Sequence, residues 1–165
     1  MRLSAIVLAG IGLSSVAFAL PATSQRADNQ ILPKSVQFQR EGESLLAAGK
    51  FEAAEDAFEA ALTVDPRNRW AFVDIAKVAD KQHLFGKAIR MTNKALLLEP
   101  NDPDAIAVQG EAMVELGATA RAQANLQKLQ SICTKGCPQV AQLSSAISRG
   151  RSVAAAKAPP TPKSD

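Results

Sequence analysis

The amino-acid sequence predicts an all-α protein, made of three tandem helical hairpins followed by a capping helix. The composition disfavours the β classes: aromatic residues make up 4% of the 165 residues, with no Tyr and one Trp, whereas sandwiches and barrels favour aromatic and β-branched residues. From Ser35 onward, small and apolar residues recur every 34 positions. Within each period the apolar residues also fall at helical spacing, which is typical of stacked helical hairpins.

The first 19 residues have the layout of a secretory signal peptide. A short basic start precedes an apolar stretch over residues 4–20, and residues 17–19, Ala-Phe-Ala, form a small-x-small cleavage site. We therefore expect a bacterial protein that is cleaved after Ala19, begins at Leu20 and is periplasmic or secreted, with no stable insertion in the membrane. The rival interpretation is an uncleaved anchor, because 17 apolar residues lie at the bottom of the spanning range.

Residues 20–34 show no clean period and contain two prolines, so we predict a linker or an N-terminal arm. The 34-residue period then defines three repeats, at residues 35–68, 69–102 and 103–136. The period is seen in matching prolines, alanines, aromatic residues and turn residues. They are Pro66 and Pro100; Ala61 and Ala95; Ala54, Ala88 and Ala122; Phe38 and Phe72; and Gly49, His83 and Gly117.

The first repeat divides into two helical stretches. Phe38, Gly42 and Leu45 lie at helical spacing, before a break at Gly49 and Lys50. The second stretch gathers its apolar residues on one face and its acidic residues on the other. The apolar face comprises Phe51, Ala54, Ala57, Phe58, Ala61 and Leu62.

The second and third repeats follow the same plan. The break between helices falls at His83 in the second repeat and at Gly117 in the third. The third repeat starts with Pro103, which is a favourable first helical residue behind Asp102 as the cap.

A helical solenoid needs its last apolar face covered. Residues 137–149 fit a capping helix, because Val140, Leu143 and Ile147 form an apolar stripe at spacings of three and four. Residues 150–165 are rich in Ala, Pro and Lys without a core pattern, so we predict a disordered tail.

Cys133 and Cys137 form an even, closely spaced pair in a chain that we expect to be exported, and they are predicted to form a disulfide. Such a bridge closes a short loop and contributes about 2 kcal/mol to stability. The C-x3-C spacing fits neither a recognised zinc site nor the C-x-x-C redox motif.

These residues resemble the tetratricopeptide repeat, over residues 35–136. The first repeat matches the family pattern at Phe38, Gly42, Leu45, Ala54, Phe58, Ala61 and Pro66. The second matches at Phe72, Ile75, Ala76, Ala79, Ala88, Ala95 and Pro100. The third matches at Ile106, Gly110, Met113, Ala122 and Leu126, then departs, with Leu129 where the family has a small Ala and Thr134 where it has Pro.

The resemblance implies a right-handed solenoid whose first helices line a concave peptide-binding groove. In that register the groove residues are Val36, Gln39, Glu43, Leu46, Trp70, Val73, Lys77, Lys81, Asp104, Ala107 and Glu111. Trp70 is the expected anchor, since Trp is enriched at binding hot spots. The alternative is that Trp70 packs on the N-terminal arm or on a neighbouring helix.

Some family members clamp a peptide's C-terminal carboxylate with Lys and Asn residues, and this chain lacks that set. Gln39 and Glu43 occupy the first repeat's groove, and Asp74 stands where an Asn is wanted. The sequence therefore argues against this ligand mode.

No set of residues indicates catalysis. His83 is the only histidine, and we expect it to be a turn residue with an unusual backbone angle. We expect no catalytic residue, no metal and no cofactor. The formal charge of +3 is too small to indicate nucleic-acid binding by itself.

We therefore predict an exported module, not an enzyme, that binds a protein or peptide partner. One alternative is an envelope-associated structural protein that uses its basic tail, since residues 137–165 carry four basic groups and one acidic group. A less favoured alternative is a thiol–disulfide enzyme.

Overall fold

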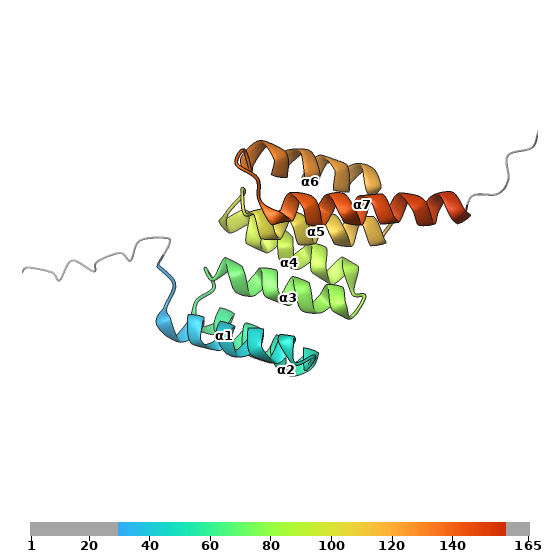
Figure 1. Ribbon diagram of the computed structural model, residues 1–165. Coiled ribbons are helices and arrows are strands. Elements are labelled where there is room, and N and C mark those ends of the chain that lie inside the picture. Colours follow the sequence, from blue (N-terminus) through green and yellow to red (C-terminus); the bar gives the residue numbers. More distant parts are fainter. Residues whose placement is uncertain (1–29, 158–165) are drawn as a thin grey trace, which may run out of the picture.

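A computed structural model describes the backbone of residues 30–157 and the side chains of residues 30–150. Within that part of the chain every element is a helix (Figure 1). The helices are α1 (Pro33–Ala47), α2 (Phe51–Val64), α3 (Arg69–Lys81), α4 (Phe85–Leu98), α5 (Pro103–Glu115), α6 (Thr119–Ile132) and α7 (Pro138–Lys157). The predicted signal peptide, most of the predicted arm and residues 158–165 lie outside the described residues.

The helices form consecutive antiparallel hairpins that stack on one another (Figure 1). Helices α1 and α2, α3 and α4, and α5 and α6 pair within hairpins, and each hairpin packs on the next. Helix α7 follows the last hairpin and packs against both α5 and α6. The prediction of an all-α chain of tandem hairpins with a capping helix is confirmed.

Small residues allow the paired helices to approach closely. In the first hairpin, a Cβ atom on Gly42 of α1 would lie 2.5 Å from Cε1 of Phe58, so the ring of this fully buried residue occupies the space that a side chain would fill. In the third, a Cβ atom on Gly110 of α5 would lie 2.6 Å from a methyl group of Leu143 in α7. The second hairpin has buried Ala76 at the matching position.

The turn within each hairpin contains one residue with left-handed backbone geometry. The φ angles are 71° at Gly49, 60° at His83 and 75° at Gly117. Glycine adopts this conformation without steric cost, whereas a residue with a side chain does so uncommonly. The expectation that His83 is a turn residue with an unusual backbone angle is confirmed.

The turns between hairpins are fixed by side chains that cap the next helix. Asn68 Oδ1 accepts a hydrogen bond from the Ala71 N–H at 3.3 Å, at the start of α3. Asp102 Oδ1 accepts one from the Ala105 N–H at 2.9 Å, at the start of α5. Since such caps satisfy backbone donors that have no partner within the helix, they define where α3 and α5 begin.

The first and last helices each extend beyond their predicted bounds. Helix α1 begins at Pro33, within the predicted arm, because proline suits the first helical position. Helix α7 continues through residues 150–157, where we predicted disorder. Gly150 explains the continuation: a Cβ atom there would lie 2.5 Å from Cγ1 of Val114, so the helix still packs closely on α5. The following residues contain three consecutive alanines, which favour helix.

Helix α7 covers the apolar end of the third hairpin. Leu143 and Ile147 are buried and form one core cluster with Ile106 of α5 and Leu129 of α6. The structure joins Cys133 to Cys137 by a disulfide with a Cα–Cα distance of 5.7 Å. This bridge spans the turn between α6 and α7 and therefore restrains the start of the capping helix.

No helix within residues 30–157 is both long and apolar enough to cross a membrane.

Candidate functional site

Helices α1, α3, α5 and α7 contact one another in order and together form one face of the stack. Glutamine side chains connect these neighbouring helices across the face. Gln39 of α1 donates to Asp74 Oδ2 of α3 at 3.2 Å. Gln139 and Gln142 of α7 donate to the carboxylates of Asp104 at 2.7 Å and Glu111 at 2.9 Å, both on α5. These three glutamines and their carboxylate partners therefore already link adjacent helices across the face.

The structure leaves most of the predicted groove residues at least partly accessible. Glu43, Trp70 and Lys81 are exposed, and the partly buried residues are Val36, Gln39, Leu46, Lys77, Asp104 and Glu111.

Val73 and Ala107 were predicted to line the groove, but they are only 2% and 1% exposed, respectively. Their assignment to an accessible surface was wrong. Val73 packs in the core between the second and third hairpins. Ala107 belongs to the cluster that α7 covers. Neither side chain is available to a ligand in this structure.

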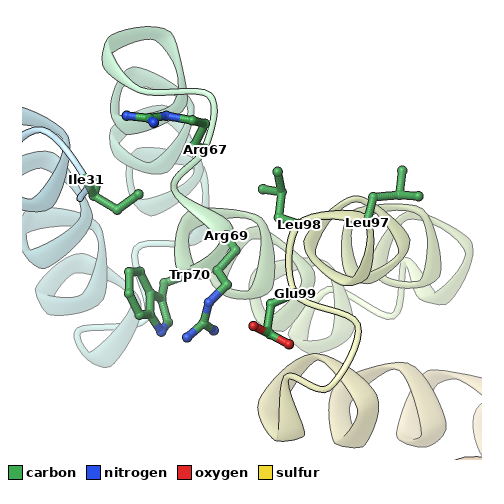
Figure 2. Close-up of a pocket in the computed structure, with 7 residues that line it drawn as sticks. All are labelled: Ile31, Arg67, Arg69, Trp70, Leu97, Leu98 and Glu99. Atoms are coloured by element: carbon green, nitrogen blue, oxygen red, sulfur yellow. The ribbon is translucent and has the colours of Figure 1, made fainter. Parts of the chain in front are cut away.

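Trp70 lies in a hollow of about 480 Å³ near the turns between hairpins (Figure 2). We call this site the tryptophan hollow; it is lined by Ile31, Arg67, Arg69, Trp70, Leu97, Leu98 and Glu99. Trp70 is 39% exposed, Leu97 is 84% exposed and Leu98 is 44% exposed. Large apolar side chains thus gather at an open surface.

Sequence reasoning found Trp70 but missed the two leucines and Ile31. The missed signal is the run of three leucines at residues 96–98, at the end of the second hairpin. One helix face cannot bury three consecutive residues, because successive side chains on a helix point about 100° apart. At least one leucine therefore had to face away from the core.

The cationic groups of the tryptophan hollow are paired with buried carboxylates. Arg69 forms an ion pair with Asp102 Oδ2, and its guanidinium carbon lies 4.1 Å from the centre of the Trp70 ring. Arg67 Nε lies 3.3 Å from Asp65 Oδ1. Because both arginines are engaged within the protein, the accessible character of the hollow is mainly apolar.

Asp65 stays ionised in this arrangement. Burial raises the pKa of its carboxyl, but hydrogen bonds from the Leu32 N–H and from Arg67 together lower the pKa by more than burial raises it. The pKa of Asp65 therefore lies below its ordinary value. The ionised Asp65 carboxylate thereby holds both Arg67 and the chain segment before α1 in place.

A second hollow, of about 390 Å³, lies where the end of α3 faces α5 and α7. It contains the predicted groove residues Lys81 and Glu111 together with Asp80, Glu115 and Arg149. Burial and the neighbouring charge of Asp80 raise the pKa of Glu111. Burial also raises the pKa of Asp80, and the charge of Glu115 adds to this effect. Over the described residues, no group of three or more His, Cys, Asp or Glu side chains has an arrangement that could hold a metal ion.

Asp74 is a buried carboxylate at the centre of the helical face. Lys77 Nζ lies 2.9 Å from its Oδ1, and Gln39 donates to its Oδ2. Burial raises the pKa of Asp74, as does the charge of Glu43, although Lys77 opposes the shift. The ionised form of Asp74 is therefore disfavoured by its surroundings.

Replacing Asp74 with Asn should stabilise the protein at pH 7. Because the folded-state pKa is raised, the folded protein holds this proton more tightly than the unfolded chain, and stability falls as pH rises from 3.8 through the folded-state pKa. Asn does not ionise, so the advantage of Asp74→Asn should shrink as pH falls toward 3.8. The lost ion pair costs little, since Lys77 is 41% exposed.

Urea unfolding at pH 7 and at about pH 4 measures this difference. The exposed Asp56→Asn variant is the matched control and should change stability by less than about 0.5 kcal/mol. An Asp74→Asn protein that is less stable than the natural one at both pH values would contradict the argument.

Comparison with known proteins extends these observations. A tetratricopeptide repeat family model matches residues 45–111. The chain is similar in structure to the Sgt2 TPR domain from Aspergillus fumigatus, with a TM-score of 0.70 and 19% identity, over 85% of this chain and 93% of that chain.

Two further similar structures are complexes. One is the first TPR of Spaghetti (RPAP3) bound to the HSP90 peptide SRMEEVD, with a TM-score of 0.65 and 17% identity, over 74% of this chain and 94% of that chain. The other is PcrH in complex with the chaperone binding region of PopD, with a TM-score of 0.61 and 20% identity, over 74% of this chain and 92% of that chain. No curated protein has a significant sequence match to the chain. The family model therefore covers the middle of the chain, and the similar structures share its fold of stacked helical hairpins.

Proposed function

We propose that this protein is an exported bacterial interaction module, without catalytic activity of its own, that binds a segment of a protein or peptide partner. The observation that carries the proposal is Trp70, a partly exposed indole in an apolar hollow at the edge of the helical face. The partner segment would lie along α1, α3 and α5 and place an apolar side chain against the indole. This mode uses a preformed surface, so little reorganisation is needed on binding.

The complexes of similar structures support a peptide or protein ligand as the class of partner. The Spaghetti (RPAP3) domain is bound to an HSP90 peptide, and PcrH is bound to a region of PopD. A carboxylate clamp is not proposed for this chain, because it lacks the Lys and Asn set: Gln39 and Glu43 occupy the first repeat's groove, and Asp74 stands where an Asn is wanted. An apolar anchor is the better fit to the residues present.

Replacing Trp70 with Ala should weaken partner binding by about 2 kcal/mol or more, which is roughly a 30-fold loss of affinity. The indole supplies a large apolar surface, and only part of it is buried within the chain itself. The measurement is capture of partners from a periplasmic extract, with identification by mass spectrometry and titration of the captured protein.

The matched control is Leu116→Ala. Leu116 is also an exposed large apolar residue, but it lies in the turn between α5 and α6 and lines neither hollow. The Leu116→Ala substitution should leave the affinity for the captured partner unchanged. If a folded Trp70→Ala protein captures the same partner with the same affinity, Trp70 is not the anchor.

Export is proposed from the signal-like layout of residues 1–19. A disulfide between Cys133 and Cys137 suits an oxidising compartment such as the periplasm. N-terminal sequencing of the protein from its host should therefore read Leu-Pro-Ala-Thr, the sequence that starts at Leu20. A product that starts at Met1 and sediments with membranes would contradict export as a cleaved protein.

A further inference from the structure

The chain enters the folded part of the protein at the wall of the tryptophan hollow. Ile31 lines the hollow, two residues before α1 begins. Arg67 donates to the Gln30 carbonyl at 3.2 Å, and the Leu32 N–H donates to Asp65 Oδ2 at 2.9 Å. Residues 30–32 are thus fastened to the turn between α2 and α3. Whatever precedes them in the chain begins beside the hollow.

The tryptophan hollow is suited to an apolar occupant. Its two arginines are paired with Asp65 and Asp102, whereas Trp70, Leu97 and Leu98 present apolar surface to solvent. Covering side chains of this kind removes apolar surface from water, which is favourable. An apolar segment that reaches the hollow therefore has a substantial driving force to stay there.

We propose that residues 20–29 of this chain fold back over the tryptophan hollow, with Leu20 and Pro21 against Trp70 and the leucines. Ten extended residues span at most about 33–36 Å, so a hollow that begins at Ile31 is well within their reach. A short tether gives the segment an effective concentration in the millimolar range. Weak apolar contacts are then enough to keep the hollow occupied.

The side-chain charges of residues 20–29 do not oppose this occupant. Arg26 and Asp28 give the segment no net side-chain charge, and its first three residues, 20–22, carry no charged side chain. The segment therefore presents an end with uncharged, apolar side chains to the hollow. A partner of the protein would have to displace this segment before it contacts Trp70, so the segment acts as an internal competitor.

The fluorescence of Trp70 tests this proposal directly, because Trp70 is the only Trp and the chain has no Tyr. The chain that begins at Leu20 is compared with one that begins at Gln30. Every helix that the structure describes starts at or after Pro33, so the shorter chain retains all of these helices, and circular dichroism checks that it is folded. We expect removal of residues 20–29 to shift the emission to longer wavelength and to increase quenching by acrylamide.

Two further variants test whether the apolar side chain of Leu20 causes the difference in Trp70 emission. In the chain that begins at Leu20, Leu20→Ser should shift the emission in the same direction, whereas Thr23→Ser should not. Identical emission and quenching in the long and short chains would overturn the proposal. An emission that depends on protein concentration in the long chain would also overturn it, and would instead assign the hollow to a second copy. None of these measurements needs a partner. The proposal for residues 20–29 can therefore fail while partner binding is confirmed, and partner binding can fail while this proposal is confirmed.

Discussion

Replacing Gly42 with Ala should lower the free energy of unfolding by about 2 kcal/mol, although Ala is the better helix former. The new Cβ atom would lie 2.5 Å from Cε1 and 2.7 Å from Cδ1 of Phe58. The phenyl ring is rigid and fully buried, so it cannot move aside as the end of a flexible side chain would. The gain of roughly 1 kcal/mol in helix propensity offsets only part of this overpacking. Urea unfolding followed by circular dichroism measures the change.

Gly86→Ala is the matched control for Gly42→Ala. Gly86 also lies in a helix, but its nearest neighbour would be the flexible end of Arg90 at 3.7 Å, so Ala there should be neutral or stabilising by about 0.5 kcal/mol. A smaller residue at position 58 should relieve the overpacking, and Phe58→Leu combined with Gly42→Ala should therefore cost less than the sum of the two changes. Additive costs would show that contact with Phe58 is not the cause.

Replacing Asp102 with Ala should destabilise the protein by about 3 kcal/mol. Asp102 is buried and has two roles, because one carboxylate oxygen caps α5 through the Ala105 N–H and the other pairs with Arg69. Loss of the cap leaves a backbone donor without a partner. Loss of the ion pair leaves a guanidinium that is about three-quarters buried without its carboxylate. Thermal unfolding of both proteins under identical conditions measures the combined cost.

Asp102→Asn separates these two roles, since the amide oxygen can still cap α5 but carries no charge. It should cost less than Asp102→Ala by about 1 kcal/mol, which is the usual contribution of a cap. The neighbouring Asn101→Ala variant is the control, because Asn101 is exposed and its replacement should change stability by less than about 0.5 kcal/mol. Equal stability of Asp102→Ala and Asn101→Ala would refute both roles.

The hairpins could be predicted from sequence because their determinants are local and repeated. Gly49 and His83 mark the left-handed turns at their own positions, and Gly42 marks close packing on Phe58 within the same hairpin. The end of α7 could not be predicted in this way. Its continuation depends on contact between Gly150 and Val114, which are far apart in sequence.

The candidate site was only partly predictable for a related reason. The repeat register placed Trp70 at an accessible position, but it also placed Val73 and Ala107 there. Whether a first-helix residue is accessible depends on how closely the next helix packs over it. Ala107 is covered because α7 lies across α5, and a single repeat carries no information about the helix that follows it.

The cap of α3 has a consequence for how the stack can be divided. The Asn68 amide donates to Ser35 Oγ at 3.0 Å, and Ser35 Oγ donates in turn to the Ala61 carbonyl at 2.7 Å, so one buried chain of hydrogen bonds joins α3 to both helices of the preceding hairpin. A hairpin is thus not a self-sufficient module. Any repeat that evolution or an engineer inserts, removes or exchanges must carry with it the polar residue that precedes it and a matching acceptor in the neighbour it leaves behind.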